Sequence, residues 1–86
     1  MSESKQLIQG KAMLEEVALG YARDHGLNLD VEWVDIGFEI MLRLSDETHT
    51  VRMMFSADEI AFFAEDDPAN RDTKMKIRNA FAGLSM

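Results

Sequence analysis

The sequence predicts an α+β fold with two layers: a three-stranded antiparallel β-meander with helices on one face, in the order α-β-β-β-α-α. Between Leu29 and Phe55, apolar and polar residues alternate with the two-residue period of strands that have one buried face. On both sides of this segment, apolar residues recur at the three- and four-residue spacing of amphipathic helices. We expect the 86 residues to form one domain, residues 1–86.

The first helix is expected from Ser4 to His25. Its core-facing side chains are predicted to be Leu7, Leu14, Val17, Ala18 and Tyr21. Gly26 follows at the position of a left-handed C-terminal cap. Gly10 and Gly20 reduce helix propensity, and close backbone packing is the expected reason for both.

A second, smaller apolar stripe lies on the same helix, about a third of a turn away. It consists of Ile8, Ala12 and Leu19. Two interpretations stay open, because either another helix of this chain covers the stripe, or a second subunit or another protein does.

The strands are expected at 29–34, 38–44 and 51–55. Asp35 and Gly37 supply turn chemistry between the first two strands. If Asp46 and Glu47 form the second loop, three apolar pairs share the core face. These are Leu42 with Val51, Ile40 with Met53, and Phe38 with Phe55. His49 is then expected opposite Leu44, as a partly buried structural histidine.

The other face of the sheet is expected to be open to solvent. It would carry Asp30, Glu32, Val34, Glu39, Met41, Arg43, Arg52 and Met54. Methionine is adaptable and common at binding surfaces, so Met41 and Met54 are candidate contacts with a protein partner. Alternatively, long charged neighbours cover them.

Trp33, the only tryptophan, ends the first predicted strand. Its parity matches that of Leu29 and Val31, which favours the core face, against the first helix and near Tyr21. If a bulge turns it outward, it becomes an exposed aromatic anchor for a partner.

The C-terminal part is predicted to form two helices. Ser56 and Glu59 have the spacing of a capping box, which begins a short helix. Asp67 and Pro68 are expected to begin the last helix, as cap and first residue. The buried face of that helix is predicted to be Ile77, Ala80, Phe81 and Leu84.

Charge is distributed unevenly along the chain, whose net charge is −7. Residues 1–67 carry fifteen acidic and five basic side chains, a balance of −10, whereas residues 68–86 carry one acidic and four basic side chains, a balance of +3. The acidic part argues against a nucleic-acid-binding protein, because phosphate neutralisation supplies most non-specific affinity. One flank of the last helix nevertheless carries Arg71, Lys74 and Arg78. This flank is either exposed to solvent only or makes a weak contact with RNA or DNA.

Two families are similar in part. The element order with a basic last helix resembles the double-stranded-RNA-binding domain in topology, but that family has a lysine-rich motif where this chain has Ser56-Ala57-Asp58-Glu59. Residues 5–55 resemble the start of acidic, dimeric type III secretion chaperones in their helix, Gly26-Leu27 and meander with an acidic second turn. The second half departs from that family, which returns to strands, so the similarity implies only a style of protein binding.

The sequence contains no motif that points to catalysis. It has no cysteine, no phosphate-binding glycine loop and no paired histidines, and Asp58, Glu59 and Glu65–Asp67 lack the spacing of a calcium loop. We therefore expect a cytoplasmic protein that is not an enzyme and has no cofactor, metal site or membrane segment.

The leading functional hypothesis is a small acidic protein–protein interaction module, which binds another protein or forms a homodimer. Its candidate contacts are Ile8, Ala12, Leu19, Met41 and Met54. The alternatives are an acidic mimic of nucleic acid that regulates a nucleic-acid-binding protein, and weak nucleic-acid binding through the basic last helix.

Overall fold

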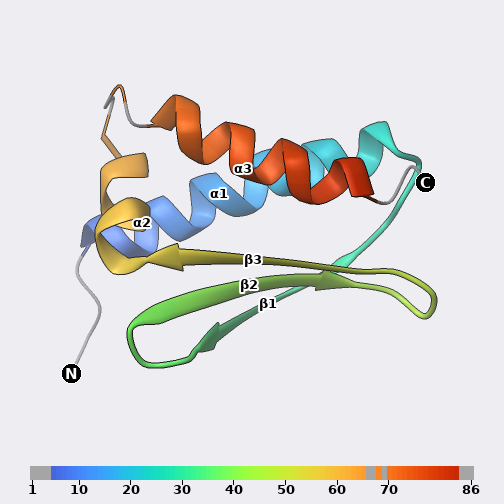
Figure 1. Ribbon diagram of the computed structural model, residues 1–86, viewed down its shortest axis with the longest axis horizontal. Coiled ribbons are helices and arrows are strands. Elements are labelled where there is room, and N and C mark those ends of the chain that lie inside the picture. The colour runs from blue at the N-terminus through green and yellow to red at the C-terminus, as the bar shows by residue number, and fades with distance from the viewer. Residues whose placement is uncertain (1–4, 66–67, 69, 84–86) are drawn as a thin grey trace.

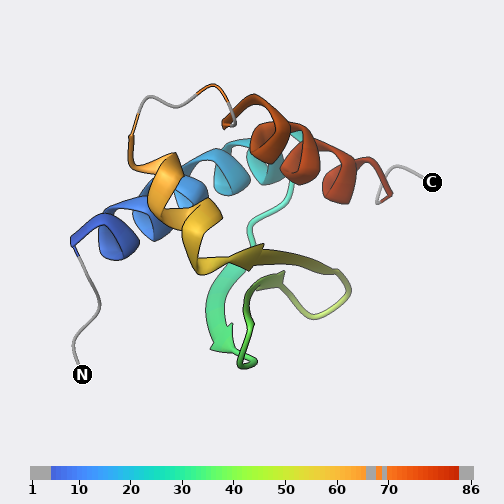
Figure 2. The ribbon, with the colours of Figure 1, turned by 60° about the vertical axis from the view of Figure 1, so that its left-hand side comes forward.

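The computed structural model describes residues 5–65, 68 and 70–83. The chain order is α1 (Lys5–Asp24), β1 (Asp30–Asp35), β2 (Glu39–Ser45), β3 (Thr50–Ser56), α2 (Ala57–Phe63) and α3 (Asn70–Ala82). The strands form one antiparallel sheet in the order β1-β2-β3. All three helices lie on the same side of the sheet (Figures 1 and 2). The predicted class and element order are confirmed.

Helix α1 ends at the predicted glycine. Gly26 has a φ of 73°, and its N–H donates to the carbonyl of Arg23 at 2.9 Å, while the N–H of Leu27 donates to the carbonyl of Ala22 at 2.8 Å. These two bonds are those of a Schellman motif, which satisfies carbonyls that the last helical turn leaves free. The chain then turns back to begin the sheet.

The core lies between the helices and the inner face of the sheet. Its buried residues are Leu14, Ala18, Ala22, Leu29, Leu42, Leu44, Val51, Met53, Phe55, Ile60, Phe63, Ile77 and Phe81. On α1 the buried row is Gly10, Leu14, Ala18 and Ala22. The predicted face was thus correct at its centre, but Leu7, Val17 and Tyr21 are only half-buried at its border.

The register between β2 and β3 differs from the predicted one by two residues. Ile40 pairs with Phe55, Leu42 with Met53, and Leu44 with Val51. The cause lies in the turn, where the Asp46 carboxylate accepts hydrogen bonds from the N–H groups of Thr48 and His49 at 2.8 and 2.6 Å. Asp46 therefore opens the turn instead of occupying its tip. A shift of two residues keeps every side chain on its predicted face.

The turn between β1 and β2 overturns the prediction for Phe38. The N–H of Ile36 donates to the carbonyl of Glu39 at 3.0 Å, and Gly37 has a φ of 100°. Gly37 and Phe38 are therefore the two central residues of a glycine-first hairpin turn. Phe38 projects from this turn with 100% of its side chain exposed and does not pair with Phe55.

Helix α2 begins at the predicted cap, since the Ser56 hydroxyl accepts from the N–H of Glu59 at 3.0 Å. Helix α3 begins at Asn70, so Pro68 is not its first residue as predicted. Ile77 and Phe81 are buried and Ala80 is half-buried, as expected. Asp67 and Leu84 lie outside the described residues. No helix of the described part is long and apolar enough to cross a membrane.

Candidate binding surfaces

The open face of the sheet brings two predicted contact residues together. Met41 and Met54 are directly opposite each other on β2 and β3, and Val34 on β1 is opposite Met41. All three side chains are half-buried. They form an apolar row across the sheet on the face that is turned away from the helices.

A charged row lies next to this apolar row. Arg43 is opposite Glu32 on one side and Arg52 on the other. The Arg43 guanidinium forms an ion pair with the Glu32 carboxylate. This pairing leaves Arg52, whose side chain is exposed, as the neighbouring cation on the open face.

The apolar row continues into the β1–β2 turn, which the sequence did not identify as a surface. Ile36 is 52% exposed, and Phe38 is fully exposed at the tip. We define the open-face patch as Val34, Ile36, Phe38, Met41 and Met54. Gly37 was the signal for it, because a glycine-first two-residue turn places the next residue at the tip instead of in the strand.

The second apolar stripe of α1 is divided by the fold. Leu19 is half-buried and packs against the core of its own chain. Ile8 is 57% exposed and Ala12 is exposed. Only the N-terminal half of the stripe therefore remains on the surface.

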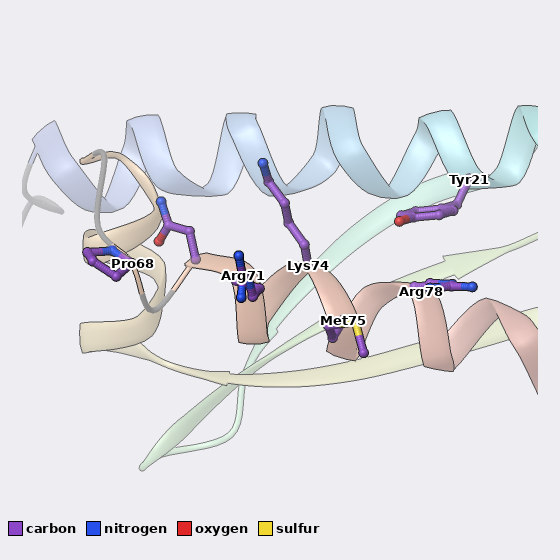
Figure 3. A pocket seen from close by; sticks show the side chains of 7 residues that line it. Tyr21, Pro68, Arg71, Lys74, Met75 and Arg78 are labelled. Atoms are coloured by element: carbon purple, nitrogen blue, oxygen red, sulfur yellow. The ribbon is translucent and has the colours of Figure 1, made fainter.

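The predicted basic flank of α3 lines a groove between α1 and α3, with a volume of about 680 Å³. Arg71, Lys74 and Arg78 project along it, and Tyr21 reaches from α1 toward Arg78 (Figure 3). Met75, which is 47% exposed, adds an apolar wall. Three cations beside an aromatic ring and a thioether suit an anionic ligand with an apolar part.

Two features reduce the groove's suitability as a deep site. The Tyr21 ring stacks on Phe81 with 6.1 Å between ring centroids, so Tyr21 also serves the core. Lys74 also borders a second hollow, which Glu16 and Arg23 line, so Lys74 does not belong to the groove alone.

Trp33 lies on the core side of β1, as favoured, but its partners differ from the expected ones. Its indole N–H donates to the Glu15 carboxylate, and its ring lies 6.3 Å from the Phe55 ring. The Lys11 ammonium lies 5.6 Å from its ring centroid. The ring is half-buried against the middle of α1, whereas Tyr21 lies farther along the helix.

His49 was predicted to lie opposite Leu44, but it is part of the β2–β3 turn, and Val51 lies opposite Leu44. The His49 Nδ1 is 3.2 Å from the Asp46 carboxylate. The N–H of Thr48 and then that of His49, each donating to the carboxylate, lower the pKa of Asp46 from its ordinary value of 3.8. The arrangement stabilises the turn.

No group of three His, Asp or Glu side chains within 5–65, 68 and 70–83 is placed to hold a metal ion. No protein-family model matches the chain, and no curated protein or solved structure is significantly similar to it. The functional argument therefore depends on the surfaces themselves.

Proposed function

We propose that this protein is a small protein–protein interaction module that uses the open-face patch. One observation carries the proposal: Phe38 is fully exposed at the tip of the turn that joins the two strands carrying Val34 and Met41. Exposing a whole phenylalanine ring to water is unfavourable by ~1.5–3 kcal/mol relative to burying it, and contiguous exposed apolar patches are typical of interaction sites. Aromatic anchors also dominate the binding energy of many interfaces.

The partner that fits this patch is a different protein with an apolar contact surface. A second copy of the chain would bring together two molecules that each carry a net charge of −7, which opposes association. Light scattering coupled to size-exclusion chromatography separates the two versions. The hetero-partner version predicts a monomer, whereas a dimer that Phe38→Ser dissociates would assign the patch to self-association.

The proposal is tested by affinity pull-down from a lysate of the native host. The three baits are the wild type, Phe38→Ser and Phe62→Ser, and the proteins that each bait retains are compared. Phe38→Ser should lose proteins that the wild type retains. Phe62→Ser is the matched control, because Phe62 is 46% exposed on α2, away from the open face, and its variant should retain them. Retention of the same proteins by all three forms would contradict the proposal.

A second candidate function, weak binding of RNA or DNA, is favoured by the convergence of three cations on the α1–α3 groove. It predicts a gel shift at low salt that weakens as salt rises. The Arg71→Ala/Arg78→Ala variant should abolish the shift, and Lys5→Ala/Arg52→Ala, which removes the same charge elsewhere, should not. Absence of a shift at low salt would end this candidate.

The acidic-mimic alternative receives less support. Several carboxylates are engaged within the fold: Glu15 accepts from Trp33, Glu32 pairs with Arg43, Asp46 accepts within its turn, and Glu59 pairs with Lys76. A mimic needs an array of free carboxylates in a line. Those held by internal partners contribute less to such an array.

A further inference from the structure

The two outer edges of the sheet differ in how they are protected. At the β3 edge, the Lys76 ammonium of α3 donates to the carbonyl of Met54 at 2.8 Å and lies 4.9 Å from the Phe55 ring centroid. Lys76 thus occupies a main-chain acceptor on which another strand would pair. Figure 1 shows β3 as the strand nearest α3 and β1 as the strand farthest from it.

The β1 edge presents main-chain groups outward. The bond from the Ile36 N–H to the Glu39 carbonyl fixes which residues face β2. Because the pattern alternates in an antiparallel pair, Val34 and Glu32 bond to β2, and Val31 and Trp33 point away from it. Each of these two outward residues offers one donor and one acceptor to an added strand. Within the described residues, no side chain donates a hydrogen bond to an outward main-chain carbonyl of β1, as Lys76 does to the carbonyl of Met54 on β3.

A pocket of about 270 Å³ lies beside this edge, between α1 and the sheet. It is lined by Leu7, Lys11, Trp33, Asp35 and Ile40. The walls from Leu7, Trp33 and Ile40 are apolar. Its volume is below the ~300–1,000 Å³ of pockets for drug-sized ligands, and matches a site for one large apolar side chain.

The charges of β1 select the partner. Its charged side chains are all acidic: Asp30, Glu32 and Asp35. Asp30 and Glu32 lie on the open face, where Glu32 is already paired with Arg43 and Asp30 is the main carboxylate offered to a partner. The pocket lies on the helix side. Successive side chains of an added strand point to opposite faces, so one parity would meet the acidic open face of β1 and the other would meet the pocket.

We propose that the β1 edge binds an extended segment of a partner protein in which basic residues alternate with an apolar anchor. The segment pairs with the outward groups of Val31 and Trp33 and inserts its anchor among Leu7, Trp33 and Ile40. Main-chain bonds supply affinity and the pocket supplies specificity, as in other strand-addition modes. Pairing of two β1 strands is less favourable, because it would bring two copies of the same three carboxylates together. This inference goes beyond the open-face proposal and uses a different surface.

The test uses the full chain and a synthetic peptide, Lys-Thr-Lys-Leu-Lys-Thr-Lys, blocked at both ends, with binding followed by NMR amide shifts. We expect shifts at Val31, Trp33 and Ile40. Replacing the leucine by alanine, or methylating its backbone nitrogen, should each weaken binding at least about fivefold. Equal binding of the three peptides would mean adsorption to an acidic surface and would overturn the proposal.

A protein variant gives the reciprocal test. Val31→Pro removes an outward N–H without removing a bond to β2, and should weaken binding of the leucine peptide at least about tenfold. Val31→Thr keeps the N–H and should bind within about twofold of wild type. If Val31→Pro does not fold, the proposal is tested by comparing the binding of the methylated and unmethylated peptides to the wild-type protein. Phe38→Ser should bind the peptide normally, so failure here and failure of the open-face proposal are distinguishable.

Discussion

Gly10 of α1 and Ile60 of α2 are in direct backbone contact. A Cβ atom at Gly10 would lie 2.0 Å from the carbonyl oxygen of Ile60, a separation that atoms do not adopt. The absence of a side chain at Gly10 therefore allows α2 to pack directly on α1. Since α2 follows β3 without an intervening loop, this contact also holds the end of the sheet against the first helix.

Gly10→Ala should destabilise the protein by about 1–3 kcal/mol, because the backbones of α1 and α2 must separate to admit the methyl group. Gly20→Ala is the matched control in the same helix. A Cβ at Gly20 meets no atom within 4 Å, so that variant should gain about 0.5–1 kcal/mol from helix propensity. Urea unfolding measures both. Equal effects of the two substitutions would contradict the contact.

Glu59→Ala should cost about 1–3 kcal/mol, because the Glu59 carboxylate joins α2 to α3. It accepts from the Thr73 hydroxyl at 3.0 Å and from the Lys76 ammonium at 2.8 Å, and Thr73 is only 3% exposed. Asp58→Ala removes the same charge from the same helical turn, and should cost no more than the ~0.3–1 kcal/mol of a helix-dipole interaction. Thermal unfolding of the two variants tests the difference, and a smaller loss for Glu59→Ala would refute the linkage.

Asp46 should make stability dependent on pH in the acid range. Its pKa is lowered in the folded protein, chiefly by the N–H of Thr48 and then by that of His49. A lowered folded-state pKa means that the stabilisation is present above 3.8 and is lost as the pH falls through the lowered value. The stability difference between wild type and Asp46→Asn should therefore shrink between about pH 5 and about pH 2. A difference that stays constant over this range would exclude the role.

Trp33→Ala should cost about 2–3 kcal/mol, below the ~3–5 kcal/mol of a fully buried aromatic residue, because the ring is half-buried. Trp33→Phe should cost less, since it keeps an aromatic ring against Phe55 and loses the bond to Glu15 and part of the indole. Tryptophan emission of the wild type should lie between the buried and exposed extremes and be partly quenched by iodide. Full quenching would place the ring outside the α1–β1 interface.

The sequence predicted the class and the faces because both depend on periodicity, which is local. The alternation in β2 and β3 was sufficient to place Met41 and Met54 on the open face. It was insufficient for register, since a two-residue shift preserves the alternation. What decided the register was the Asp46 side chain, whose bonds to the N–H groups of Thr48 and His49 move the centre of the turn one residue later and so shift each strand pair by two.

Other features depend on contacts between distant segments. The 2.0 Å approach at Gly10 requires Ile60, which is fifty residues away, and the same sequence argument failed at Gly20, where space is open. Exposure of Phe38 followed from the turn around Gly37, although hydrophobicity alone favours burial. The basic flank of α3 was visible in the sequence, but Tyr21 joined it only through packing of α1 on α3.

The central claim, that the open-face patch contacts a partner protein, is tested most directly by site-specific photo-crosslinking in the native host. The photoreactive analogue benzoylphenylalanine replaces Phe38, the fully exposed tip residue, in one form. In the control it replaces Phe62, which is exposed on α2. We predict a discrete crosslinked protein from position 38 and not from position 62. Absence of a specific crosslink at 38, or the same pattern at both positions, would contradict the claim.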